Sequence, residues 1–180
     1  MSEKLNIVVI GGSAAGPKAA ARARRMNSDA NITIIQKDND LSMASCGYPY
    51  YVGGVIEQRE KLICTPTGVV RDPDFFQKAK DIRALTNTEV TKINKEEKRV
   101  IYNDLKNGEE GVIDYDKLII ATGATPKMPP VPGIELEGIT TLQSMRDADY
   151  LREISDKGEI QKAVVIGGGL IGIETCEALH

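Results

Sequence analysis

The sequence has few of the residues that build disulfide frameworks and metal sites. Its 180 residues include three cysteines, far apart at Cys46, Cys64 and Cys176, and a single histidine, His180. A disulfide-rich domain or a structural zinc site needs several cysteines, or cysteines and histidines at short spacing. The sequence therefore predicts neither kind of site, and no metal ligand is assigned.

The sequence also lacks a strong charge of one sign and long apolar runs. The 23 Lys plus Arg against 26 Asp plus Glu give a formal net charge of -3, and no basic stretch interleaved with aromatic residues favours nucleic acid. No apolar run approaches membrane-spanning length, and the first residues enter an apolar strand without the charged n-region and long apolar h-region typical of a secretory leader. We expect a cytoplasmic globular protein, whose 41% hydrophobic residues suffice for one sizeable core and the start of a second.

What the sequence does contain is an apolar run that leads into glycines. Leu5–Ile10 is typical of a parallel strand covered on both faces, and Gly-Gly-Ser-Ala-Ala-Gly follows it. In this modified dinucleotide pattern Gly11 permits the tight turn, Ser13 takes the place of the middle glycine, and Gly16 lets the next helix pack closely on the strand. A glycine-rich turn without a ligand is the alternative.

The segments after this turn favour the dinucleotide interpretation. They predict an Ala-rich helix from about Pro17 to Met26 and a second strand, Ile32–Ile35, which completes a βαβ unit. That strand ends in Gln36, Lys37 and Asp38, where the pattern expects an acidic residue for the ribose hydroxyls. The Gln36 amide oxygen can accept one such hydrogen bond, but without the charge of a carboxylate the contact should be weaker.

Three cations lie on the predicted helix at spacings of four and three residues. Lys18, Arg22 and Arg25 therefore share one side of the helix. Two interpretations stay open. The stripe is either a solvated face or an anion site next to Cys46.

The middle of the chain predicts a β-meander inserted into the parallel architecture. Its candidate strands are Thr88–Ile93, Arg99–Tyr102 and Val112–Tyr115, after a short helix near Phe75–Lys80. Leu118–Ala121 is another buried-type strand, and Thr122 and Gly123 follow it, where open α/β sheets place ligands. We expect Cys64 to be a small buried hydrophobic residue.

A cluster of prolines and glycine at residues 126–133 divides the chain, because it suits neither a helix nor a central strand. We predict a first domain over residues 1–125, a linker over 126–143 and the start of a second domain over 144–180. Ser144 should cap a helix that ends near Lys157. A strand at Lys162–Ile166 should then lead into a second glycine pattern, Gly167–Gly172, which is a complete GxGxxG.

The segment Ser42–Tyr51, together with the two glycine patterns and Ala121-Thr122-Gly123, resembles the FAD-dependent pyridine nucleotide–disulfide oxidoreductases. It is most similar to their single-cysteine branch, which contains coenzyme A-disulfide reductases, CoA-persulfide or polysulfide reductases, NADH oxidases and NADH peroxidases. Two-cysteine members carry a second cysteine five residues after the first, where this chain has Tyr51. The resemblance implies an α/β fold, in which a Rossmann-like FAD-binding domain with an inserted meander precedes the start of a Rossmann-like NAD(P)-binding domain.

The resemblance also implies three sets of site residues. The redox-active catalytic thiol is Cys46. The residues expected to contact FAD or the nicotinamide nucleotide are Gly11, Gly12, Ser13, Ala14, Ala15, Gly16, Gln36, Lys37, Ser45, Val90, Ala121, Thr122, Gly123, Gly167, Gly169 and Gly172. The residues expected around a coenzyme A-type substrate are Lys18, Arg22, Arg25, Ser42, Ser45 and Lys80. Ser45 stands where an asparagine is common in the family, which puts one substrate hydrogen bond in doubt.

We therefore expect an oxidoreductase that uses FAD with NADH or NADPH to reduce a small sulfur compound such as coenzyme A disulfide, a persulfide or a polysulfide. The chain stops inside the second helix, so the sequence predicts the first part of a longer, homodimeric enzyme, inactive by itself. Cys176 on that helix is expected to pack. Three alternatives stay open: an NADH oxidase or peroxidase that cycles Cys46 through a sulfenic acid, a non-catalytic FAD-binding redox sensor, and a nucleotide-binding domain with a structural cysteine.

Overall fold

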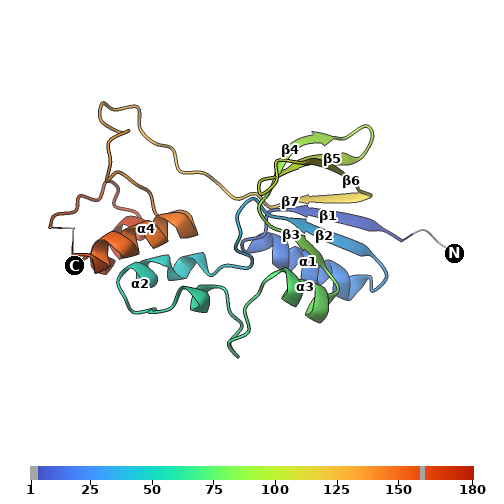
Figure 1. Ribbon diagram of the computed structural model, residues 1–180, viewed down its shortest axis with the longest axis horizontal. Helices are drawn as coiled ribbons and strands as arrows, with labels where there is room; N and C mark the ends of the chain where they lie inside the picture. The colour runs from blue at the N-terminus through green and yellow to red at the C-terminus, as the bar shows by residue number, and fades with distance from the viewer. Residues whose placement is uncertain (1–3, 159–160) are drawn as a thin grey trace. The chain divides into compact units, whose positions relative to one another are not determined.

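The computed structural model describes residues 4–158 and 161–180 and divides the chain into two compact units (Figure 1). The first unit comprises Met1–Met43 and Ile63–Gly123, and the second comprises Ala44–Leu62 and Ala124–His180. The segment that carries Cys46 therefore groups with the residues after the proline-rich connection.

The first unit contains a parallel sheet, an antiparallel sheet and two helices. The four parallel strands, in the order β3-β2-β1-β7, are β3 (Arg83–Leu85), β2 (Asn31–Ile35), β1 (Asn6–Ile10) and β7 (Lys117–Ile120). The antiparallel meander consists of β4 (Thr88–Asn94), β5 (Arg99–Asp104) and β6 (Glu110–Asp114). The helices are α1 (Ala15–Met26) and α3 (Pro73–Lys80). This is a Rossmann-like α/β fold with an inserted meander, as the sequence predicts.

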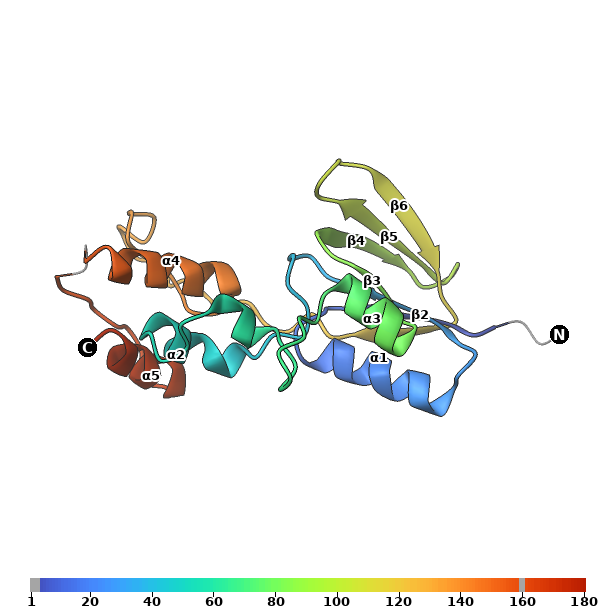
Figure 2. The same cartoon turned by 60° about the horizontal axis from the view of Figure 1, so that its bottom comes forward.

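The alternation of side chains along β1 explains why both faces of the parallel sheet are covered. Ile7 and Val9 pack into a core with Ala20 of α1 and Phe76 of α3. Val8 and Ile10 point to the opposite face, as successive residues of a strand must, and pack into a second core that includes Val100 of β5. Helices α1 and α3 thus cover one face of the sheet and the meander covers the other (Figures 1 and 2).

The second unit consists of short helical segments packed on one another. They are the 3-10 helices η1 (Ser45–Gly47) and η2 (Arg59–Leu62) and the helices α2 (Tyr48–Val52), α4 (Met145–Asp156) and α5 (Leu170–Ala178). Helix α4 buries Met145, Ala148 and Leu151 along one side, at the three-residue spacing of a helix face. Gly53, just after α2, passes so close to α5 that a Cβ there would lie 3.1 Å from the Cα of Ala178.

Most predicted elements form, and their bounds shift by a few residues. The predicted helices become α1, α3 and α4, and Ser144 caps α4 as expected. Residues 126–133 form neither helix nor strand. Strand β3 and helix α2 escaped prediction. The three residues of β3 are too few to show a period. Helix α2 contains a proline and three tyrosines, which are not strong helix formers, so its sequence does not predict a helix.

Three expectations from the sequence are wrong. Lys162–Ile166 forms no strand, and Val164 and Ile166 are 80% and 86% exposed. A strand needs a neighbour to pair with, and the second unit contains none among its described residues. Cys64 is only half-buried, because it forms an isolated β-bridge with Val70 rather than joining a core. Cys176 is exposed and does not pack.

Candidate functional site

The first glycine turn has the close backbone packing that a dinucleotide site requires. Gly11 has a φ of +106°, a conformation that favours glycine, and its N–H donates to the Ile35 carbonyl at 2.8 Å. A Cβ on Gly11 would overlap the Ala121 carbonyl, and a Cβ on Gly16 would overlap the Gly11 carbonyl. Any larger residue would therefore push apart the turn, the helix and the end of β7.

Helix α1 begins at this turn without a side-chain cap. Its N-cap residue is Ala14, whose side chain supplies no cap hydrogen bond. The uncapped N–H groups and the helix dipole together attract an anion. The turn thus fits a dinucleotide pyrophosphate, and the contacts expected of Ser13 and Ala15 stay predictions.

The Gln36 side chain reaches this turn from the end of β2. It is 5% exposed, and its Oε1 accepts a hydrogen bond of 2.7 Å from the backbone N–H of Gly12. Its Nε2 lies 3.5 Å from Oδ2 of Asp38. An amide oxygen has a second lone pair, so Gln36 can hold Gly12 and still accept from a ribose hydroxyl, which stays a prediction.

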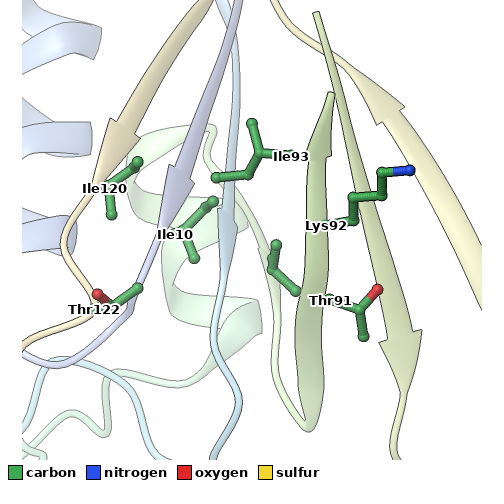
Figure 3. Close-up of a pocket in the computed structure, with 7 residues that line it drawn as sticks. Ile10, Thr91, Lys92, Ile93, Ile120 and Thr122 are labelled. Atoms are coloured by element: carbon green, nitrogen blue, oxygen red, sulfur yellow. The ribbon is translucent and has the colours of Figure 1, made fainter. Parts of the chain in front are cut away.

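A pocket of about 240 Å³ lies between the parallel sheet and the meander. It is lined by Ile10, Val90, Thr91, Lys92, Ile93, Ile120 and Thr122. Figure 3 shows Ile10, Ile93 and Ile120 around a common space, while the amine of Lys92 points away from it. Two predicted cofactor contacts, Val90 and Thr122, are therefore brought together. Lys37 instead pairs with Glu89 at 2.7 Å on the surface.

The cations of α1 divide into two groups. Arg24 is held in place, because its guanidinium donates to the carbonyls of Ser28 and Asp81 and pairs with the Asp81 carboxylate at 3.2 Å. The three predicted cations Lys18, Arg22 and Arg25 are exposed, and in residues 4–158 and 161–180 none has a hydrogen-bond or ion-pair partner. Helix α1 contains no acidic residue. The three charges form a stripe on a helix that contributes no carboxylate of its own.

Two further predicted substrate contacts lie in the same unit. Lys80 ends α3, and its Nζ lies 5.6 Å from the ring centroid of Phe75. Ser42 has a φ of +54°. Its N–H donates to the Gly12 carbonyl at 2.7 Å, and its own carbonyl accepts from Arg71 at 3.1 Å. These two hydrogen bonds tie Ser42 to the dinucleotide turn and hold its uncommon backbone conformation.

Cys46 lies in the second unit, in the 3-10 helix directly before α2. Its side chain is exposed, as is that of Ser45. The N–H of Ala44 donates to the Leu62 carbonyl at 2.8 Å, which closes the cysteine segment into a loop. Leu62 also packs on Gly47, where a Cβ would overlap its side chain. The thiol is thus exposed on a segment whose backbone is held by the hydrogen bond to Leu62 and by the packing of Leu62 on Gly47.

The second glycine pattern has the same local geometry as the first. Gly167 has a φ of +122°, and a Cβ on Gly172 would overlap the Gly167 carbonyl. Helix α5 follows with Gly169 as an N-cap that supplies no side-chain hydrogen bond. The predicted nucleotide turn therefore forms, although the strand expected before it does not.

Cys46 and the start of α5 line one pocket of about 290 Å³ inside the second unit. Its walls are formed by Ser45, Cys46, Tyr48, Pro49, Leu142, Gln143, Leu170, Ile171 and Glu174. Leu142, Leu170 and Glu174 are not among the site residues predicted from the sequence. Leu170 and Glu174 are four residues apart on α5 and so share a helix face. Once the helix is assigned, this spacing predicts that the two side chains line the same surface.

The described residues show no metal-binding group of three or more His, Cys, Asp or Glu side chains. In the same residues we find no helix whose length and apolar character would let it cross a bilayer.

The fold and the two glycine turns are those of a Rossmann-like α/β protein. The family model for pyridine nucleotide-disulphide oxidoreductases matches residues 5–180, so the chain belongs to this family, whose members bind FAD and NAD(P)H. The chain is 34% identical over 174 residues to the coenzyme A disulfide reductase of Staphylococcus haemolyticus, covering 97% of this chain and 38% of the relative. It is 29% identical over 175 residues to the NADH oxidase of Methanocaldococcus jannaschii, with the same coverage of both chains.

Among solved structures, the chain is similar to an NAD-dependent persulfide reductase from A. fulgidus, with a TM-score of 0.93 and 47% sequence identity. The match covers 97% of this chain and 32% of that one. The chain spans 38% of the length of both curated relatives above.

Proposed function

We propose that the full-length protein is a FAD-dependent NAD(P)H oxidoreductase that reduces a disulfide, persulfide or polysulfide through Cys46, with coenzyme A-linked sulfur compounds as its substrates. The observation that carries this proposal is the pocket of the second unit. One wall is formed by the exposed thiol and the other by the first turn of the helix that follows the complete glycine pattern. A thiol and a nucleotide turn at one cavity suit electron transfer to sulfur.

This chain's residues fit the two nucleotides. The uncapped starts of α1 and α5 suit pyrophosphates, and overlap at Gly16 and Gly172 leaves no room for larger residues. Gln36, Val90 and Thr122 are the further candidates for FAD contacts. Bound at these residues, FAD would supply the chemistry of hydride acceptance from a nicotinamide and of two-electron transfer to sulfur.

Cys46 performs the covalent step. As a thiolate it attacks the sulfur–sulfur bond of the substrate, forms a mixed disulfide with one half and releases the other half as a thiolate that takes up a proton. Two electrons then cleave the mixed disulfide, which releases the second thiolate and restores Cys46. Because Tyr51 stands where two-cysteine members have their second thiol, the partner sulfur comes from the substrate.

The stripe of Lys18, Arg22 and Arg25 supports a substrate that carries phosphates. Arginine guanidinium groups bind phosphate oxygens in a bidentate way, and coenzyme A has several phosphates whereas inorganic polysulfide has none. The names of two similar proteins, a coenzyme A disulfide reductase and a persulfide reductase, agree with this class of substrate.

The test uses the full-length FAD-loaded enzyme with NAD(P)H and, in turn, coenzyme A disulfide, polysulfide, hydrogen peroxide and oxygen. We expect sulfur acceptors to be reduced fastest and Cys46→Ser to abolish that reaction. A peroxide rate that exceeds both sulfur rates, or full turnover in Cys46→Ser, would contradict the proposal.

The double variant Arg22→Gln/Arg25→Gln tests the substrate class. It should raise KM for coenzyme A disulfide by about tenfold or more, since each charge-assisted contact contributes on the order of 1.5–3 kcal/mol, and leave KM for polysulfide unchanged. The double variant Lys95→Gln/Lys106→Gln, which removes the same charge from exposed turns of the meander, is the control. Equal effects in both double variants would indicate general charge attraction instead of a phosphate site.

A second candidate is an NADH oxidase or peroxidase that cycles Cys46 through a sulfenic acid. The exposure of Cys46 and the similarity to an NADH oxidase favour it. Trapping the sulfenic acid with dimedone during turnover with peroxide, together with unchanged kinetics in Arg22→Gln/Arg25→Gln, would select this candidate. A protein that binds FAD but is inert with all four acceptors would be a redox sensor.

A further inference from the structure

Tyr51 is a buried residue of α2 whose hydroxyl is held by a distant part of the second unit. Its side chain is 9% exposed, and its hydroxyl lies 3.2 Å from Oδ1 of Asp149 on α4. Burial raises the pKa of Tyr51, and the charge of Asp149 and the hydrogen bond to it raise it further. The hydroxyl therefore keeps its proton at neutral pH and remains a donor to the carboxylate.

Asp149 also binds Arg59, near the end of the segment Ala44–Leu62 that carries Cys46. Nε of Arg59, in η2, donates to both oxygens of the Asp149 carboxylate at 3.2 Å and 3.0 Å. One carboxylate thus joins α4 to two points of the segment, one in α2 and one in η2. Hydrogen bonds of this kind, with an ionised partner, are the stronger ones in proteins.

Arg152, on the next turn of α4, binds the backbone carbonyl of Tyr51. Its Nη1 donates to the Tyr51 carbonyl at 2.9 Å, and its guanidinium carbon lies 5.8 Å from the centre of the tyrosine ring. Asp156 orients this guanidinium through a 2.7 Å contact with Nε. We name Tyr51, Arg59, Asp149 and Arg152 the α4 latch.

The latch acts on the element that carries the reactive thiol. Cys46 lies in η1, which runs directly into α2 at Tyr48. A helix of five residues is not stable by its own hydrogen bonds and depends on tertiary contacts for its position. Helix α2 packs on α4 and α5 through its buried side chains. The latch adds side-chain hydrogen bonds between α2 and α4, so it contributes to the position of α2 and of the thiol before it.

We propose that Asp149 is a positioning residue for Cys46, acting through Tyr51 and Arg59. The inference rests on the proposed function, because it assigns the latch a role in the transfer of electrons to Cys46. Two-cysteine members have a second thiol where this chain has Tyr51. Here the Tyr51 side chain instead fixes α2, the helix that directly follows Cys46.

The test compares the two half-reactions of the full-length FAD-loaded enzyme by stopped-flow absorbance. Asp149→Asn keeps the size of the side chain but removes its charge. We expect reoxidation of the reduced enzyme by coenzyme A disulfide, which needs Cys46, to slow by about tenfold or more, since a misplacement of about 1 Å can cost a factor of 100. Reduction of the oxidised enzyme by NAD(P)H should change less than about twofold, because it does not need the thiol.

Glu153→Gln is the matched control. It removes a carboxylate from the same helix, where Glu153 is exposed and, among the described residues, pairs only with Lys157 at 2.6 Å. Both half-reactions should keep their rates. Tyr51→Phe removes one hydroxyl of the latch and should give a smaller loss, about threefold, again confined to reoxidation. If Asp149→Asn slows both half-reactions equally, or neither, the latch does not position Cys46.

A readout without turnover separates this inference from the proposed function. Hydrogen exchange of residues 44–62 should be about tenfold faster in Asp149→Asn and unchanged in Glu153→Gln, because the amides of α2 open when their tertiary contacts are lost. If wild-type turnover does not need Cys46, the proposed function fails while this exchange still tests the latch. If Asp149→Asn does not fold, Tyr51→Phe replaces it, and exchange and reoxidation at wild-type rates in that variant would overturn the inference.

Discussion

Gly11–Gly16 and Gly167–Gly172 form the same turn in different surroundings. Both begin with a glycine at positive φ, +106° and +122°, and in both a Cβ on the last glycine would overlap the carbonyl of the first. The strand before the first turn pairs with two neighbours, whereas the apolar run before the second pairs with none in the described residues. The turn is therefore a local structure, and the strand is not.

The largest difference between the two turns should appear at their last glycines. Gly16→Ala should cost more than about 3 kcal/mol, because the Gly11 backbone it strikes is held by Ile35 and closely packed against Ala121. Gly172→Ala should cost less than about 1.5 kcal/mol, since the Gly167 backbone has open space around its Cα and can shift. Urea unfolding of the 180-residue variants measures both costs, and equal costs would break the comparison.

The second glycines should differ by a smaller amount. A Cβ on Gly12 would lie 2.6 Å from Cδ2 of Leu41 and 2.9 Å from Cβ of Gln36, whereas one on Gly168 would meet nothing within 4 Å. Gly12→Ala should lower the free energy of unfolding by about 1–3 kcal/mol, and Gly168→Ala by less than about 0.5 kcal/mol. Urea unfolding of the two variants is the measurement, and a cost at Gly168 as large as that at Gly12 would contradict it.

The capped helix α4 differs from α1 and α5, whose first turns are free for an anion. Ser144 Oγ accepts from the Asp147 N–H at 3.2 Å, and Asp147 Oδ2 accepts from the Ser144 N–H at 3.1 Å. Ser144→Ala should therefore cost about 1 kcal/mol in the free energy of unfolding. Ala14→Ser, in the uncapped helix α1, is the opposite test, and we expect it to gain less than Ser144→Ala loses, since Ala14 has φ and ψ of -114° and -57° instead of an extended cap conformation. Thermal unfolding compares the two.

The same cap predicts a pH dependence. Burial acts to raise the pKa of Asp147, but the hydrogen bonds from the N–H groups of Gln143 and Ser144 and the hydroxyl of Thr141 outweigh it, so the pKa is lowered. A carboxyl with a lowered folded-state pKa stabilises the fold above its unfolded pKa, which is about 3.9 for Asp, and loses that effect as pH falls through the folded value. The stability difference between wild type and Asp147→Asn, about 1 kcal/mol at pH 7 because the group is partly exposed, should shrink below about pH 4. A difference that stays constant from pH 7 to pH 3 would contradict this assignment.

The smallest predicted effect concerns Gln36, whose side chain accepts a hydrogen bond at the first glycine turn. Among the described residues no side chain accepts such a bond at the second turn. Gln36 accepts from Gly12, and Gln36→Glu would place a charged acceptor at the same point. We expect a few-fold tighter FAD binding in the full-length protein, since hydrogen bonds to a charged group are about twice as strong as neutral ones. Fluorescence titration of the apoprotein with FAD measures the change. Weaker binding would mean that burial of the charge outweighs the stronger hydrogen bond.

Much of the first unit could be predicted from the sequence, because its signals are local or periodic. The continuous apolar run of β1 and the β-rich runs of the meander lie in consecutive residues, so their strands were found within a few residues. Helix α2 was missed because its stability comes from α4 and α5. The pocket residues Leu142 and Glu174 were missed for the same reason, since no local pattern links them to Cys46.

The amino-acid order alone decides where the chain turns tightly, because the positive φ at Gly11 and Gly167 favours glycine at both positions. It also places three cations on one side of α1, through helical spacing. Tertiary structure decides the rest. It determines that Arg24 is bound to Asp81 while Arg22 and Arg25 have no partner among the described residues. In the same residues Lys162–Ile166 pairs with no strand, and Tyr51 contacts Asp149, 98 residues away. Strand pairing and long-range hydrogen bonds depend on partners that no local sequence specifies.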